Sequence, residues 1–288
     1  MVNQTWTLLK ESISSFLQDE ALTRGAAIAF YTVTSIGPVL FIIVAIAGLV
    51  FGEEAASGAV SAQLGGLMGQ QSAELLQTAI QNASGKLSGS LATLLGVIVL
   101  IITASGVFTE MQQTLNVIWK AEPQGSTVSA LLRARATSLG LVAALGFLLL
   151  VSLVISTILT ALSNFINAML PAGHLILQTL NFLASFVLIT VLFAAIYKMV
   201  PDRRIEWRDV VVGAVATSLL FTIGKFLIGL YLGSSTVATS YGAAGGLIIV
   251  LLWVYYSAQI FLFGAEFTKA YAHHHGSRTR QAVSAGVS

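Results

Sequence analysis

Long apolar segments set the strongest limit on what this chain can fold into. Stretches of about 20 residues with almost no charge recur along the sequence, and a helix of that length crosses a hydrocarbon core about 30 Å thick. A soluble domain needs charged side chains on its surface, amounting to about 25% of its residues. This chain has 9% charged and 56% hydrophobic residues. The sequence therefore predicts an all-α, polytopic membrane protein.

Six segments satisfy this length requirement and are bounded by charged or turn-forming residues. The predicted spans are residues 28–50, 90–109, 138–162, 175–198, 210–231 and 244–267. They make a transmembrane domain, 28–267, between a cytoplasmic or interfacial segment, 1–27, and a cytoplasmic tail, 268–288, that we expect to be disordered. The first 25 residues carry charges and no continuous apolar core, so we expect no cleavable signal peptide.

Basic residues divide unevenly between the two sides of such a six-span chain. Twelve of the fourteen Lys and Arg residues fall in the terminal segments and in the two loops on the same side. Of the other two, Lys86 lies in an opposite loop and Lys225 lies inside the fifth span. Because Lys- and Arg-rich loops stay on the cytoplasmic side, both termini are predicted to be cytoplasmic.

Two segments outside the spans have helical patterns. Apolar residues recur at three- and four-residue steps near the N-terminus, at Trp6, Leu9, Ile13 and Phe16. Residues 4–22 are therefore expected to form an amphipathic helix, which either lies on the cytoplasmic interface or packs under the bundle. The long external loop, 52–88, is predicted to hold short helices that cap the outer mouth.

Lys225 is the most unusual residue of the predicted spans. An ionised side chain at that depth costs about 2.5 to 3.5 kcal/mol. Three compensations stay open. Lys225 can reach the outer interface, pair with one of the acids of the external loop, or face a hydrated cavity that receives an anionic head group; the acids concerned are Glu53, Glu54 and Glu74.

Helix-breaking and small residues interrupt two spans. Ser35, Gly37 and Pro38 predict a kink in the first span, which is either packing geometry or one wall of a polar cavity. Tyr241 precedes the sixth span, where Gly242 and Gly246 form a small-xxx-small pair that is typical of close helix packing.

Two acids stand where predicted spans meet the cytoplasm. Glu110 follows the second span, and Glu266 lies near the end of the sixth. Each is either an interfacial anchor paired with Lys or Arg, or part of a polar vestibule shared with Gln112 and Asn116. The sequence leaves both interpretations open.

Several function classes lack their usual residues. The chain has no cysteine, so thiolate chemistry and Cys-ligated metals are excluded. A net charge of +2 is too small to predict nucleic-acid binding. The histidines, His174 and the run 273–275, offer no rigid frame for a catalytic metal, and no phosphate-binding glycine loop is present. We therefore expect no enzyme, no cofactor and no metal.

A basic loop follows the fourth span. It contains Lys198, Arg203, Arg204 and Arg208. The loop is first a determinant of topology, and second a candidate binding surface for anionic lipid.

Short motifs spread over the chain resemble one family. They are Ala26, Ala27, Ala29, Phe30, Tyr31, Ser35 and Pro38, then the run 114–119 (TLNVIW), Tyr197 and Lys198 with Pro201, Tyr241 and Gly242, residues 253–255 (WVY), and residues 264–266 (GAE). Together they resemble the YihY/BrkB family of bacterial inner-membrane proteins, which has carried virulence-factor and ribonuclease labels. The resemblance implies a multi-pass protein of the bacterial inner membrane, with six helices and cytoplasmic termini, and it supplies no reaction.

Three functions stay open from the sequence. The first is a passive or ion-coupled transporter or flippase of a lipid or another amphiphile. The second is a non-catalytic scaffold or envelope-assembly factor, and the third, which lacks the residues it needs, is a nuclease. Membrane lipids are the expected partners, and small residues in the third and fifth spans also permit a homo-oligomer. The candidate cavity or substrate-path residues are Lys225, Tyr31, Ser35, Pro38, Glu110, Asn116, Tyr241 and Glu266.

Overall fold

Helices account for nearly all of the chain that the structure describes. The computed structural model describes residues 2–52, 54–58, 60–61, 74, 77–78, 106–121, 173–234 and 244–276. Five long helices are α1 (Val2–Gln18), α2 (Ala21–Phe51), α7 (Gly173–Met199), α8 (Trp207–Ser234) and α10 (Gly245–His274). Another helical stretch covers residues 106–119. No strand occurs among these residues, which confirms the all-α prediction for this part of the chain.

Three of the described helices are long and apolar enough to cross a membrane. They contain the segments Gln178–Met199, Trp207–Tyr231 and Gly245–His274, with mean hydropathies of 2.3, 2.0 and 2.0. These segments correspond to the predicted fourth, fifth and sixth spans. The third span and nearly all of the second, most of the external loop 52–88, and residues 277–288 lie outside the described residues, so six spans with cytoplasmic termini stay a prediction.

The predicted first span lies within α2. This helix continues from Ala21 to Phe51 through Gly37 and Pro38. The Ser35 hydroxyl donates to the Tyr31 carbonyl oxygen at 2.7 Å, within the helix. Ser35 therefore satisfies its polar group locally, and a kink at Pro38 stays a prediction.

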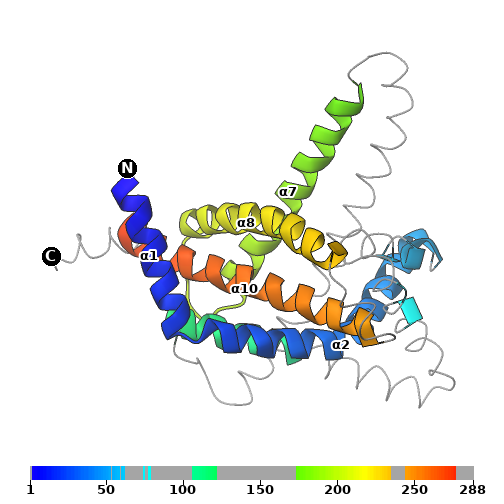
Figure 1. The fold of residues 1–288 in the computed structure, drawn as a ribbon, viewed down its shortest axis with the longest axis horizontal. Helices are drawn as coiled ribbons and strands as arrows, with labels where there is room; N and C mark the ends of the chain where they lie inside the picture. The colour runs from blue at the N-terminus through cyan, green and yellow to red at the C-terminus, as the bar shows by residue number, and fades with distance from the viewer. Residues whose placement is uncertain are drawn as a thin grey trace.

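α10 is the centre of the described bundle. It packs against α8, α2 and α1, and α7 packs against α8. Figure 1 shows α8, α10 and α2 running side by side, while α7 projects away from them. The start of α8 and the end of α10 lie at one end of the bundle, beside α1. We call this the α1 end.

Small residues bring α8 and α10 very close together. A Cβ atom on Gly264 would lie 2.0 Å from Thr217 Oγ1, and one on Gly213 would lie 1.8 Å from Thr268 Oγ1. Tyr197 of α7 reaches the same contact, where its hydroxyl donates to the Phe261 carbonyl oxygen at 2.7 Å. Only glycine fits at these positions, so the three helices are held at a fixed separation.

α1 packs on the bundle with one face and exposes an apolar stripe on another. Leu8 and Ser12 are buried, and Phe16 meets Phe263 of α10 in an edge-to-face contact with ring centroids 6.0 Å apart. The exposed apolar residues are Trp6, Leu9, Ile13 and Leu17. The predicted amphipathic helix is thus present, it packs against α10, and Phe16 belongs to its inner face.

A tight turn separates α1 from α2. Asp19 and Glu20 lie between the two helices, and Glu20 has φ 53°, in the left-handed region that non-glycine residues seldom occupy. Arg24 braces this turn, because its Nε donates to the Asp19 carbonyl oxygen at 3.0 Å. The turn places Asp19 against α10.

Candidate functional site

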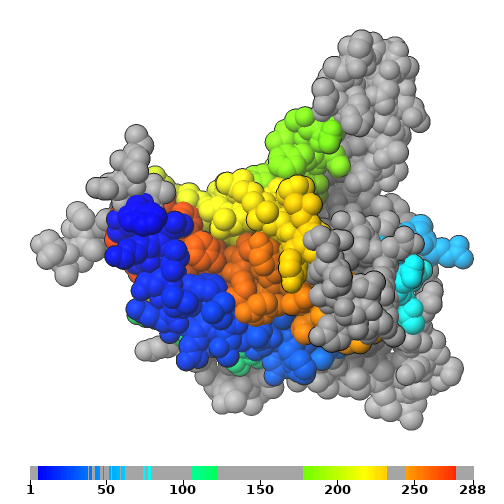
Figure 2. Space-filling model, in the orientation of Figure 1, coloured from blue at the N-terminus to red at the C-terminus, as the bar shows by residue number. Residues whose placement is uncertain are grey.

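An apolar groove runs between α8 and α10. Its volume is about 330 Å³. Its lining comes from α8 (Leu220, Ile223, Gly224, Leu227), from α10 (Tyr256, Gln259, Ile260, Phe263) and from α1 (Phe16). The lining residues of each long helix recur at three- and four-residue steps, so each helix contributes one continuous face. We call this hollow the lateral groove; Figure 2 shows α8 and α10 side by side, with α1 at one end.

Gly224 lets α8 approach α10 at the groove. A Cβ atom at this position would lie 2.5 Å from Ile260 Cδ1 and 3.0 Å from the Tyr256 ring. A larger residue would therefore push the two walls apart or fill the space between them.

Two of the lining residues carry hydrogen-bonding groups, Tyr256 with its hydroxyl and Gln259 with its amide. Gln259 Nε2 is 3.4 Å from the Leu22 carbonyl oxygen, a long hydrogen bond to α2. Its Oε1 is buried and accepts no hydrogen bond from a described residue. An unpaired buried oxygen is costly, above all at membrane depth, and this amide packs against α2, where a Cβ atom on Gly25 would lie 3.2 Å from Oε1.

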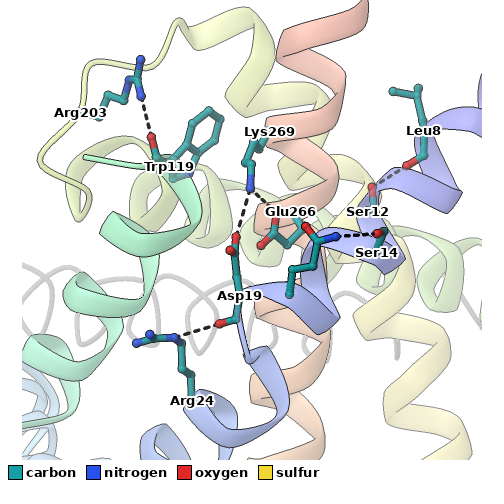
Figure 3. Close-up of polar contacts among 10 residues, drawn as sticks. Leu8, Ser12, Ser14, Asp19, Arg24, Trp119, Arg203, Glu266 and Lys269 are labelled. Atoms are coloured by element: carbon teal, nitrogen blue, oxygen red, sulfur yellow. Dashed lines mark hydrogen bonds and ion pairs between the residues drawn. The ribbon is translucent and has the colours of Figure 1, made fainter. Parts of the chain in front are cut away.

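A charge cluster lies at the α1 end of the groove. Lys269 Nζ is 3.0 Å from Glu266 Oε2 and 3.2 Å from Asp19 Oδ2. The side chains of Lys269, Asp19 and Glu266 are 11%, 20% and 0% exposed. Figure 3 shows the ammonium group between the two carboxylates, one from the α1–α2 turn and one from α10. We call these three residues the charge cluster.

An aromatic pair separates the groove from the charge cluster. Phe16 and Phe263 both line the groove and contact each other. Asp19 and Glu266 each follow one of these residues by three positions, which is close to one helical turn. An apolar hollow and a buried ionic cluster therefore adjoin at this contact between α1 and α10.

The loop between α7 and α8 is fixed to the helix at 106–119. Asn116 Nδ2 donates to Asp202 Oδ2, and Asn116 Oδ1 accepts from the Asp202 backbone N–H, both at 2.8 Å. Gln112 donates to the same carboxylate at 3.2 Å, and Arg203 donates to the Trp119 carbonyl oxygen at 2.7 Å. These contacts join the segment that follows the predicted second span to the loop between the predicted fourth and fifth spans.

The predicted vestibule residues divide between two places. Gln112 and Asn116 contact Asp202, whereas Glu266 belongs to the charge cluster. Glu110 is half-buried on the helix at 106–119. Glu266 pairs with a lysine, as an anchor would, but it is fully buried.

The predicted path residues are also dispersed. Lys225 is half-buried on α8, does not line the groove, and has no ion pair or hydrogen bond with any residue the structure describes. Tyr31 is exposed on α2, one turn from buried Ser35. Tyr241 and the side chain of Pro38 lie outside the described residues.

The basic loop has two kinds of members. Lys198 donates to the Ile205 carbonyl oxygen, and its ammonium lies 5.5 Å from the centre of the Trp207 ring, a cation–π distance. Arg203 binds the end of the helix at 106–119, while Arg204 and Arg208 are exposed. Arg203 is exposed as well, and the binding of anionic lipid by these guanidinium groups stays a prediction.

No metal site emerges from the described residues. No group of three or more His, Asp or Glu side chains within them is placed to hold an ion.

The sequence analysis did not identify Asp19 and Lys269 as members of a charge cluster. It also did not identify Phe16 and Gln259 as residues that line a groove. The spacing of Glu266 and Lys269 permits an ion pair on one helix. Asp19 is 250 positions from Lys269, and no local pattern indicates that contact.

Comparison with known proteins places the chain among membrane proteins. Residues 12–286 match a family described as Virulence factor BrkB. Proteins named UPF0761 membrane protein are similar: one from Azotobacter vinelandii is 30% identical over 87% of this chain and 60% of its own length. One from Yersinia pestis is 33% identical over 66% of this chain and 64% of its own length. One from Rhodospirillum centenum is 30% identical over 60% of this chain and 37% of its own length. The matched part of this chain thus spans about 37 to 64% of these relatives, and no solved structure matches it significantly.

Proposed function

The chain belongs to the Virulence factor BrkB family, as its motifs indicate, and from that premise we propose that it is a passive or ion-coupled transporter of a lipid or another amphiphile in the bacterial inner membrane. The relatives are named only as membrane proteins, so the proposal rests on the chemistry of the lateral groove. The groove is the single observation that carries it.

The position of the groove favours an acyl chain as its occupant. Its walls are α8 and α10, both candidate membrane spans. Within a membrane, the hydrocarbon chains of lipids surround such helices. An empty hollow loses the dispersion contacts of every atom that lines it, so an acyl chain that enters the groove restores contacts along both walls.

The polar atoms near the groove favour an amphiphile rather than a hydrocarbon. The Tyr256 hydroxyl and the Gln259 amide belong to lining residues, and a hydroxyl or amide N–H of a bound molecule can donate to their oxygens. Lys225 does not line the groove, so it supports the proposal only in the case that it faces a separate hydrated path. The expected substrate is therefore an apolar chain joined to a hydrogen-bond donor.

Bulky substitutions at the rim of the groove test this function. Ile223→Trp and Leu227→Trp place large rings in the groove from exposed positions on α8, where the folded bundle can accept them. Phe226→Trp is the matched control, because Phe226 is exposed on the same helix and does not line the groove.

The assay measures movement of a fluorescent lipid in proteoliposomes, with a quencher that bleaches only the outer leaflet. We expect translocation to fall at least tenfold in the two rim variants and to stay at the wild-type rate in Phe226→Trp. Equal rates in all four proteins would show that the groove is not on the path.

A membrane scaffold is the second candidate function. The exposed apolar stripe of α1, from Trp6 to Leu17, is the feature that favours it, because large exposed apolar surfaces mark contacts with a protein or a membrane. A scaffold predicts proteins that co-purify with the wild-type chain and are lost when Trp6 and Ile13 are both changed to Gln. Purification as a homogeneous species with bound lipid alone would count against it.

A further inference from the structure

We propose that the charge cluster is a proton-binding site, in which Asp19 and Glu266 together hold one proton beside the Lys269 ammonium group. The site is independent of the lipid proposal, because it concerns the occupancy of one proton and not the movement of a substrate.

The charges of the cluster do not balance without a proton. Two carboxylates and one ammonium carry a formal charge of −1 within a packed contact between helices. Glu266 is 0% exposed, and the other two side chains are at most 20% exposed. An uncompensated charge in such a place carries a large desolvation penalty. One added proton makes the cluster neutral.

The geometry provides a place for that proton. Lys269 binds one oxygen of each carboxylate, Glu266 Oε2 and Asp19 Oδ2. The other Glu266 oxygen, Oε1, is buried and receives no hydrogen bond from a described donor. Two carboxylates that share one cation repel each other unless one of them carries a proton. Glu266 Oε1 can therefore carry the proton while Oε2 keeps its contact with Lys269.

Among the described residues, no other charged group near α10 neutralises the −1 charge of the cluster. Arg24 of α2 binds the carbonyl oxygen of Asp19, makes no ion pair with either carboxylate, and lies on the far side of Asp19 from Lys269 (Figure 3). Glu11 of α1 pairs with His274, two turns farther along α10. Asp209 of α8 is buried beside the C-terminal end of α10. Tyr197 of α7 is bonded to Thr217 and to a carbonyl of α10.

The position of the site gives the proton a mechanical consequence. Asp19 belongs to the turn between α1 and α2, whereas Glu266 and Lys269 belong to α10. Loss of the proton leaves a net charge of −1, two carboxylates around one ammonium, in the contact between the α1–α2 turn and α10. Deprotonation therefore weakens this contact beside the aromatic pair, Phe16 and Phe263, that lines the groove.

Infrared spectroscopy of the full chain in lipid nanodiscs tests the proposal, because a protonated carboxyl group has a C=O stretching band that a carboxylate lacks. At pH 7 the wild-type protein is expected to show the band of one buried carboxylic acid, which disappears as a single proton is released on raising the pH. This titration needs no variant, so it does not depend on the folding of a mutant.

The formal charge of the cluster predicts which variants keep the infrared band of the carboxylic acid. Glu266→Gln and Asp19→Asn each leave one carboxylate and one ammonium, which balance, so both are expected to lose the band. Lys269→Met leaves two carboxylates without a cation, so it is expected to keep the band and to gain intensity from a second protonated carboxyl group. Glu54→Gln, at an exposed position, is the control and leaves the band unchanged.

Three results would overturn the proposal. Absence of the band in the wild-type protein at pH 7 would mean that both carboxylates are ionised. Persistence of the band in Asp19→Asn would mean that the two acids do not share the proton, and its loss in Lys269→Met would mean that the proton depends on the lysine. None of these results bears on lipid translocation, so the two proposals fail separately.

Discussion

Gly264→Ala is expected to destabilise the bundle strongly, although it adds a single methyl group. The new Cβ atom would lie 2.0 Å from Thr217 Oγ1 and 2.6 Å from the Tyr197 hydroxyl oxygen. These two oxygens are hydrogen-bonded to each other at 3.1 Å, and Tyr197 also donates to Phe261. All three helices that meet at this point must move to admit the methyl group.

The magnitude follows from the contacts that are lost. Overpacking of a well-filled core costs about 1 to 3 kcal/mol, and each buried hydrogen bond that is displaced costs about 1 kcal/mol. The sum is about 2 to 5 kcal/mol. For a chain of this size each kcal/mol lowers the midpoint of thermal unfolding by about 2 to 4 °C, so a decrease on the order of 10 °C is expected.

Thermal unfolding of the purified protein in one detergent measures this effect. Gly229→Ala on α8 is the matched control, since a Cβ atom there has no described atom within 4 Å. Replacing an exposed helical glycine with alanine stabilises a helix by about 0.5 to 1 kcal/mol, so this variant should unfold at or slightly above the wild-type temperature. Equal midpoints for Gly264→Ala and Gly229→Ala would refute the close contact of α7, α8 and α10.

Two further predictions concern other parts of the chain. Asn116→Ala removes both 2.8 Å contacts with Asp202 and is expected to lower the stability of this contact by about 1 to 3 kcal/mol. Protease cleavage of the loop between α7 and α8 should then be faster than in the wild-type protein. Gln113→Ala is the control, because it removes an exposed amide from the same helix and should leave the cleavage rate unchanged. Lys225→Met is expected to lower lipid translocation without lowering the yield of folded protein, if the ammonium group faces the path. Full activity in that variant would assign Lys225 to the outer membrane interface instead.

The long helices were predictable because their signal is local. Hydropathy summed over about 20 residues identified both ends of α7 and α8 and the start of α10 within about three residues, whereas α10 continues past the predicted end at residue 267 to His274. The three-residue periodicity near the N-terminus likewise identified α1. The sequence did not show which face of α1 packs against the bundle. Phe16 lies on the inner face because it contacts Phe263 of α10, a residue that is distant in the sequence.

The candidate site was mostly beyond the reach of sequence patterns. The lateral groove exists because α8 and α10 pack at Gly213, Gly224 and Gly264, and the sequence does not reveal which helices become neighbours. The charge cluster depends on a turn at Glu20 that carries Asp19 to a helix 250 positions away. Glu266 was identified as a polar residue at a span end, but its burial follows from packing on several sides at once.

Reconstitution of the wild-type chain alone is the most direct test of the proposed transport. The purified protein is placed in liposomes at a series of protein-to-lipid ratios, with and without an imposed proton gradient, and the fraction of fluorescent lipid that becomes accessible to the external quencher is followed. Transport predicts that this fraction and its rate rise with the number of protein molecules per vesicle. Rates equal to those of protein-free liposomes at every ratio, with and without the gradient, would contradict the account and leave the scaffold as the function to pursue.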